Sequence, residues 1–174
     1  MTPWQEKNNI DVVMGEATIT AAGTLEVKEE KGTTRQMSAK NIVIATGSSS
    51  AVPPTWKIDG ERVLTYMEAI LQEHLPSSAV IIGAGAIGVE FASIWSSYGS
   101  QVTLVEMLPR ILPLEDEESS AELSKAYKKR GIQVLAGYKV ESLEISARGV
   151  KVIISGENSQ RTVEAEQALV AVGF

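Results

Sequence analysis

The chain has 174 residues, of which 44% are hydrophobic and 22% are charged, and its formal net charge is −6. It is long enough to bury a core, and its interspersed charges with a net negative balance argue against a nucleic-acid partner or an anionic membrane surface. No apolar run approaches the ~18 residues that cross a membrane, and the first residues lack the basic and apolar regions of a signal peptide. We therefore expect a cytoplasmic protein without membrane contact.

Two residue counts exclude further classes of site. Cysteine is absent, so these residues form neither disulfides nor thiolate metal sites. The single histidine, His74, lies near the expected end of a helix and is interpreted as a surface residue. The acids at 115–118 fit the start of a helix better than a metal site. Without a G-x-S-x-G motif, serine hydrolase chemistry is disfavoured as well.

The first fifty residues favour strands. Runs at 11–20 and 23–30 are rich in strand-forming residues, with Gly23 in the turn between them, and 41–45 reads as a buried strand that stops before Gly47. Serine and proline then dominate to residue 54, which marks a candidate boundary. The sequence therefore predicts two regions, 1–54 and 55–174.

From about residue 60, short apolar runs alternate with amphipathic segments, which predicts an α/β fold of the Rossmann type with a parallel sheet. Helices are expected at 65–75, 86–98 and 115–130, strands at 79–82, 101–106, 132–136 and 168–174, and an antiparallel meander at 140–147, 149–155 and 161–166. One apolar face is expected on the second helix, formed by Ile87, Phe91, Ile94, Trp95 and Tyr98.

A glycine motif joins the strand at 79–82 to the helix that follows it. Gly83, Gly85 and Gly88 form G-x-G-x-x-G. In a dinucleotide-binding turn the first glycine permits the tight turn, the second lets a pyrophosphate approach the backbone, and the third lets the helix pack closely. The helix N-terminus then offers free N–H groups and about half a positive charge to the phosphates. The alternative is a turn used only for packing.

An acid ends the next strand. Glu106 follows Gly83 by 23 residues, close to the spacing of about 20 at which a carboxylate binds the adenosine ribose. Such an acid favours NAD over NADP, because it repels a 2′-phosphate. Arg110 leaves the preference open, since an arginine can pair with a phosphate. The alternative interpretation of Glu106 is a solvated strand end. No tyrosine is followed by lysine at the fourth position, which disfavours a short-chain dehydrogenase.

Four stretches, 41–54, 77–113, 131–144 and 168–174, resemble the flavoprotein disulfide reductases, and within them most closely the dihydrolipoamide dehydrogenases. The resemblance implies an NAD-binding domain at 55–174 and a β-rich, C-terminal strip of an FAD-binding domain at 1–54. It implies a parent enzyme that passes electrons between NAD and a dithiol through FAD. NADH oxidases and mercuric reductases remain alternative relatives.

The resemblance also assigns roles to single residues. Ile87 and Glu90 would lie near the nicotinamide, Val140 would line the adenine pocket, and Gly173 would approach NAD by its backbone. Core packing is the alternative for Ile87 and Val140, and a surface acid is the alternative for Glu90. The full NAD set is Gly83, Ala84, Gly85, Ala86, Ile87, Gly88, Val89, Glu90, Glu106, Val140 and Gly173. The FAD set in a complete enzyme is Ala17, Thr46, Gly47 and Ser48.

The chain also departs from the family pattern. The glycine motif for FAD and the redox Cys-x4-Cys pair are missing, and Phe174 stands where the family usually has arginine. We therefore expect a truncated chain without catalytic or metal-binding residues of its own; a stand-alone NAD-binding module is the alternative. The resemblance implies a homodimeric parent enzyme and is compatible with membership of a 2-oxoacid dehydrogenase complex.

Overall fold

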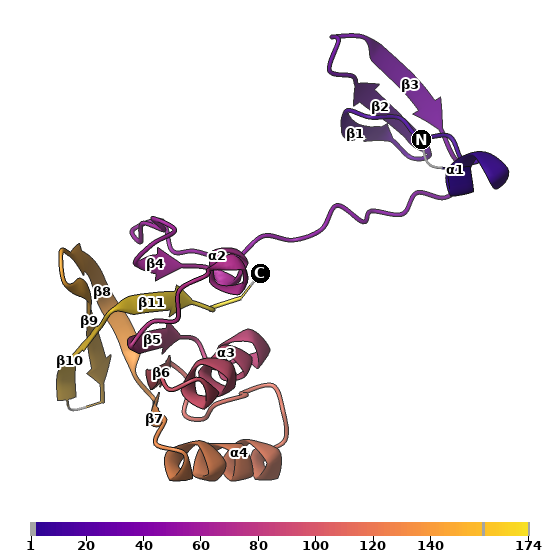
Figure 1. The fold of residues 1–174 in the computed structure, drawn as a ribbon. Helices are drawn as coiled ribbons and strands as arrows, with labels where there is room; N and C mark the ends of the chain where they lie inside the picture. The colour runs from indigo at the N-terminus through magenta and orange to yellow at the C-terminus, as the bar shows by residue number, and fades with distance from the viewer. Residues whose placement is uncertain (1–2, 158, 174) are drawn as a thin grey trace. The chain divides into compact units, whose positions relative to one another are not determined.

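The computed structural model describes residues 3–157 and 159–173, and the chain divides into two units, Met1–Gly47 and Ser48–Phe174 (Figure 1). The division falls at the start of the segment rich in serine and proline, seven residues before the end of the first predicted region. Each unit has its own sheet or sheets and is described separately.

The first unit is a small antiparallel sheet preceded by a short helix. Its elements are α1 (Pro3–Lys7), β1 (Glu16–Ala21), β2 (Thr24–Lys28) and β3 (Thr34–Ser38), with the strands in the order β1-β2-β3. Gly23 turns the chain between β1 and β2 with a φ of 71°. Among the described residues of this unit, Val27 alone is buried.

The strand predicted at residues 41–45 is not formed, and that prediction is wrong. The segment is extended without ladder hydrogen bonds, and Val43 and Ile44 are 86% and 72% exposed. A strand needs a neighbour to bond its backbone groups. No described strand pairs with this segment, so its apolar residues lie open to solvent.

The second unit is built on a parallel sheet of five strands. Its members, in spatial order, are β4 (Val63–Leu64), β11 (Gln167–Val170), β5 (Ser78–Ile82), β6 (Gln101–Glu106) and β7 (Gln133–Ala136). The sheet confirms the α/β fold class and the four predicted strands, but β11 ends at Val170, earlier than the predicted strand at 168–174. Parallel strands require crossover connections, and helices supply those from β5 to β6 and from β6 to β7.

The helices of this unit are α2 (Tyr66–Leu71), α3 (Ala86–Ser97) and α4 (Glu117–Lys129). α2 ends four residues earlier than predicted, because Gln72 is extended with a ψ of 142°. It buries only Ala69 among its residues, so little packing supports a longer helix. None of the helices in the described chain is both long and apolar enough to cross a bilayer.

The predicted meander is confirmed. β8 (Lys139–Ser146), β9 (Gly149–Gly156) and β10 (Ser159–Ala165) form an antiparallel sheet in the order β10-β9-β8. This sheet lies on one side of the parallel strands, whereas α3 and α4 lie on the other (Figure 1).

Alternate residues of the parallel strands enter two separate cores. On β5, Ala79 and Ile81 pack with the helices, whereas Val80 and Ile82 pack with the meander. All four are at most 4% exposed. Burial on both faces explains the continuous apolar sequence of this strand.

The buried face of α3 differs from the predicted one. Ile94 and Tyr98 are 47% and 75% exposed, so the prediction is wrong for these two. Trp95 is buried as predicted, and the other buried residues of the helix are Gly88, Val89 and Ala92. Gly88 and Ala92 have minimal side chains, which lets the helix lie close to the sheet while Trp95 packs into the core.

Candidate dinucleotide-binding site

The turn after β5 requires glycine at its first position for reasons internal to the fold. Gly83 has a φ of 101°, in the region that favours glycine. A Cβ placed there would lie 2.2 Å from the carbonyl oxygen of Ala171. The Gly83 N–H donates to the carbonyl of Val105 at 2.8 Å and so joins the turn to β6.

The third glycine is also required by packing. A Cβ at Gly88 would lie 1.9 Å from the carbonyl oxygen of Gly83. Any larger residue would therefore push the first turn of α3 away from β5. This is the close approach of helix and strand that the motif predicts.

The middle glycine has no such constraint. Gly85 has a φ of −75°, which any residue adopts, and a Cβ there would meet no atom within 4 Å. The interpretation of the motif as a packing device explains Gly83 and Gly88 but leaves Gly85 unexplained. The open space beside Gly85 fits a group that approaches the backbone closely, as a pyrophosphate does.

The three helices of the second unit begin differently. α2 is capped by Thr65 in a capping box with Glu68, and α4 by Asp116, whose carboxylate accepts from the Ser119 N–H at 2.8 Å. The N-cap of α3 is Gly85, which has no side chain to cap the helix. Its first-turn N–H groups therefore have no side-chain acceptor and can bind an anion.

The Glu106 side chain fastens this turn to the end of β6. The residue is only 8% exposed, so it is not the solvated strand end of the alternative interpretation. Its Oε2 accepts from the Ala84 N–H at 2.7 Å, and its Oε1 accepts from the Leu108 N–H at 2.9 Å. Each carboxylate oxygen accepts about two hydrogen bonds, so both retain capacity for a ribose hydroxyl.

The loop after β6 is bonded to the glycine turn at a second point. The Leu112 N–H donates to the carbonyl of Ala84 at 2.7 Å, and Leu112 itself has a φ of 45°. A positive φ is costly for leucine and persists only where the surroundings enforce it. The turn and the loop therefore form one connected backbone unit.

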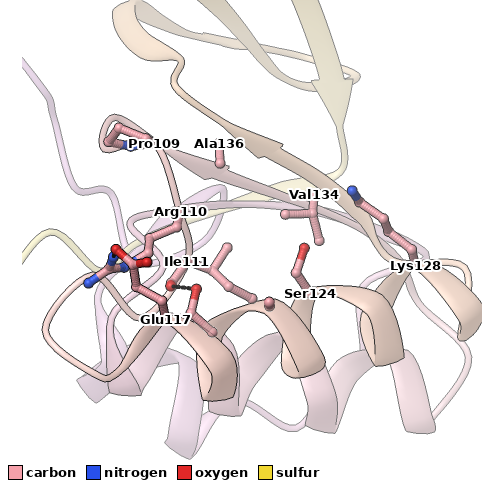
Figure 2. Close-up of a pocket in the computed structure, with 10 residues that line it drawn as sticks. Pro109, Arg110, Ile111, Glu117, Ser124, Lys128, Val134 and Ala136 are labelled. Carbon is pink, nitrogen blue, oxygen red and sulfur yellow. Dashed lines mark hydrogen bonds and ion pairs between the residues drawn. The ribbon is translucent and has the colours of Figure 1, made fainter.

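Arg110, the cation nearest to Glu106 in sequence after the strand, is engaged within its own loop. Its Nη1 donates to Glu117 Oε1 at 2.7 Å, and its Nη2 donates to the carbonyls of Pro113 and Glu115, each at 3.2 Å. Figure 2 shows this pair at one end of an open pocket of about 530 Å³ that lies between the loop, α4 and β7, with Lys128 at the other end. The guanidinium is therefore not free to meet a phosphate in this arrangement.

Five further residues of the predicted NAD set lie in the glycine turn and the first turns of α3. Ala84 and Val89 are buried, Ile87 is half-buried, and Ala86 and Glu90 are exposed.

Val140 and Gly173 lie further along the chain. Val140 is half-buried against the core between the meander and the parallel sheet. Gly173 has a φ of 131°, and its carbonyl accepts from the Ala51 N–H at 2.8 Å.

The residues predicted to contact FAD all lie on exposed backbone. Ala17 is in β1, opposite Val27, and Thr46 and Gly47 end the first unit. Ser48 begins the second unit. Gly47 has a φ of 79° and open space around a Cβ position, so its positive φ alone accounts for this glycine.

Sequence reasoning missed a residue that holds α3 in place. Tyr127 of α4 is 4% exposed and donates its hydroxyl hydrogen to the carbonyl of Val89 at 2.6 Å. Burial raises the pKa of Tyr127, so the phenol stays protonated and remains a donor. Its place among the apolar positions of α4 indicated burial, but no pattern in the sequence indicated the partner.

Sequence reasoning also missed a polar cluster at the opposite end of the parallel strands, before β5 and β11. Glu166 Oε2 accepts from the hydroxyl and the N–H of Ser77 at 2.7 and 2.8 Å, and Oε1 contacts His74 Nε2 at 2.7 Å. These bonds, led by the Ser77 hydroxyl, lower the pKa of Glu166 to about 2. Because Ser77 and His74 bond the same carboxylate and not each other, the cluster is a structural tie and not a nucleophilic triad.

Comparison with known proteins places this geometry in context. Residues 4–174 match the family model described as pyridine nucleotide-disulphide oxidoreductase. A dihydrolipoyl dehydrogenase from Mycobacterium leprae is 41% identical over 172 residues, covering 97% of this chain and 37% of that protein. The chain thus spans little more than a third of the length of such relatives.

Solved structures show the same likeness. The structure of LpdA from Mycobacterium tuberculosis matches with a TM-score of 0.82 and 27% identity, over 97% of this chain and 37% of that one. A water-forming NADH oxidase from Lactobacillus brevis, solved with NADH, matches with a TM-score of 0.72 and 26% identity, over 91% of this chain and 37% of that one.

Proposed function

The chain belongs to the pyridine nucleotide-disulphide oxidoreductase family, and we propose that its second unit binds NAD(H) at the turn from Gly83 to Gly88. The family resemblance inferred from the four stretches is thereby confirmed. The observation that carries the proposal is the middle glycine. Neither its φ nor the packing around it requires a glycine at position 85. The space beside Gly85 is empty, and Gly85 is the N-cap of α3, which no side chain caps. A pyrophosphate explains both features.

Each part of the site then has a defined task. The first-turn N–H groups of α3 bind the pyrophosphate, and Glu106, already held by Ala84 and Leu108, accepts the ribose hydroxyls. Because the carboxylate is fixed before the cofactor arrives, little conformational entropy is lost on binding. Ile87 and Glu90 border the nicotinamide, Val140 borders the adenine, and the Gly173 backbone approaches the cofactor, as the family resemblance implies.

The bound nicotinamide supplies the hydride chemistry, and this chain supplies its position. In a complete dihydrolipoyl dehydrogenase-like enzyme, Ala17, Thr46, Gly47 and Ser48 contribute to FAD binding, and electrons pass between NAD and a dithiol through FAD. These 174 residues contain no cysteine, so the dithiol–disulfide step is not carried by them. We propose a homodimer for the complete enzyme.

A relationship to NADH oxidases is the alternative, because one such enzyme shares this fold. The curated relatives favour the dihydrolipoyl dehydrogenase-like function, since the dihydrolipoyl dehydrogenase from M. leprae is 41% identical over 172 residues. NAD(H) binding by this chain is common to both functions.

Calorimetric titration of the 174-residue chain with NADH and with NADPH tests the proposal. We expect NADH to bind in the micromolar to millimolar range and NADPH more weakly. Absence of NADH binding by the folded chain would contradict the proposal.

Gly85→Val provides a sharper test, because a Cβ at this position would meet no atom within 4 Å. This variant should lose NADH binding while its thermal unfolding stays close to that of the wild type. Gly88→Val is the contrasting control, since its side chain would collide with the Gly83 carbonyl and should destabilise the fold itself. If Gly85→Val kept its affinity for NADH, the pyrophosphate would not bind beside Gly85, and the proposal would be contradicted.

A further inference from the structure

We propose that Glu117 helps to determine which cofactor this site accepts, because it holds Arg110 in the loop and away from the position of a 2′-phosphate. The inference rests on the proposed NAD(H) site. It assigns a specificity role to a residue of α4 that lies outside the glycine motif and outside the predicted NAD set.

The position of Arg110 is the first step. Its loop is bonded to the Glu106 carboxylate on one side of the arginine and to the glycine turn on the other. On one side Leu108 donates to Glu106, and on the other Leu112 donates to the carbonyl of Ala84. Arg110 therefore lies on the segment that borders the ribose-binding carboxylate. An arginine near this acid is the usual partner of a 2′-phosphate.

The second step is the present engagement of the guanidinium. Nη1 is bonded to Glu117, and Nη2 is shared between the Pro113 and Glu115 carbonyls. Glu117 is the only charged group among these partners. Nε is buried and Nη2 is already shared between two carbonyls, so a 2′-phosphate would meet Arg110 through Nη1, where it competes with Glu117 for the guanidinium.

The third step is the strength of this engagement. The side chains of Arg110 and Glu117 are 37% and 85% exposed, so water screens the pair. Exposed ion pairs of this kind shift an equilibrium by roughly 1.5- to 5-fold. The effect of Glu117 on cofactor choice should lie in that range, in addition to the larger repulsion that Glu106 exerts on a 2′-phosphate.

Glu118 offers a matched control. It lies beside Glu117 in the first turn of α4, carries the same charge, and forms no ion pair with any described residue. Glu118→Gln therefore removes one negative charge from the same helix start without releasing Arg110. If Glu117→Gln raises NADPH affinity more than Glu118→Gln does, the difference measures the effect of releasing Arg110.

The experiment is calorimetric titration of the 174-residue chain with NADPH and with NADH, for the wild type, Glu117→Gln, Glu118→Gln and the double variant Arg110→Gln/Glu117→Gln. We expect Glu117→Gln to bind NADPH about 1.5- to 5-fold more tightly, the range of an exposed ion pair, and NADH with little change. Glu118→Gln should leave NADPH affinity nearly unchanged, and the double variant should lose the gain. Thermal unfolding verifies that each protein is folded, and Glu117→Ser repeats the test if Glu117→Gln is not.

Three results would overturn the inference while leaving the NAD(H) site intact. The first is an equal gain in NADPH affinity from Glu117→Gln and Glu118→Gln, which would mean a general effect of charge. The second is NADH binding with no gain in NADPH affinity in Glu117→Gln. The third is a gain in NADPH affinity that survives removal of Arg110 in the double variant. Failure of the folded wild type to bind NADH would overturn the proposed function and this inference together.

Discussion

The two units of the chain differ in how far apart in sequence their contacts lie. In Met1–Gly47 the strands follow one another and pair in sequence order, and every residue of β1 is exposed. In Ser48–Phe174, β11 pairs with β4 and β5 across about a hundred residues, and the parallel sheet is covered on both faces. The second unit thus has what an independent domain needs, whereas the first has pairing without a core.

The largest expected effect comes from separating the two units. We expect residues 48–174 alone to unfold cooperatively on heating, because both core clusters lie within them. Residues 1–47 alone should show no cooperative transition, since a sheet that buries so little apolar surface is not stable in water. Circular dichroism with thermal melting measures both. A cooperative transition in the isolated first unit would contradict the conclusion that this unit lacks a stabilising core.

A core substitution in each unit sharpens the comparison. Leu104→Ala in β6 removes a residue that is 0% exposed and should lower the free energy of unfolding by about 2–5 kcal/mol. Leu25→Ala in β2, where the side chain is only half-buried, should cost less than about 1 kcal/mol. Urea denaturation measures both changes. Similar costs for the two variants would contradict the difference between the units.

A smaller effect is expected from the tie between α3 and α4. Tyr127→Phe removes the hydroxyl that donates to the Val89 carbonyl and should lower the free energy of unfolding by about 1 kcal/mol. Tyr98→Phe is the matched control, because Tyr98, the C-cap residue of α3, is 75% exposed and its hydroxyl should contribute almost nothing. Equal denaturation midpoints for the two variants would show that the Tyr127 bond does not contribute to stability.

The smallest expected effect is the pH dependence of the Glu166 cluster. Since folding lowers the pKa of this carboxyl from 4.5 to about 2, its contribution is complete above pH 4.5 and is lost as the pH falls towards 2. We expect a loss on the order of 1 kcal/mol, because partial exposure screens the cluster.

Glu166→Gln removes the titrating group and provides the comparison for that measurement. The stability of this variant should fall less steeply than that of the wild type between pH 4.5 and 3, as followed by urea denaturation. Parallel pH profiles for the two proteins would exclude the cluster as a source of acid sensitivity.

The sequence predicted most of the second unit because its signals were local. Apolar runs, the glycine motif and the acids and bases of α4 placed the strands, the turn and two of the three helices. Residues 41–45 carried the same apolar signal, but a strand also needs a neighbour, and the composition of one segment does not supply it. Helical periodicity likewise placed α3 but not its buried face, since the space near β5 admits Gly88 and Ala92 more readily than Ile94.

The sequence identified the residue types of the candidate site but not their bonds. Spacing pointed to Glu106, but not to the two backbone N–H groups that hold its carboxylate. It raised Arg110 as a phosphate partner, but not its engagement by Glu117. Such contacts depend on how the loop folds back across the turn, and the spacing of residues in the sequence does not predict the path of the loop.

The three glycines of the turn differ in the reason for which selection would retain them. Substitution of Gly83 or Gly88 would damage the fold, so selection for a folded protein is enough to retain both. Gly85 is free of that constraint, because its backbone is ordinary and its surroundings are empty. A lineage that kept this fold but stopped binding a dinucleotide would be free to replace it. Of the three glycine positions, position 85 is therefore the one whose residue best indicates whether a related chain still binds the cofactor.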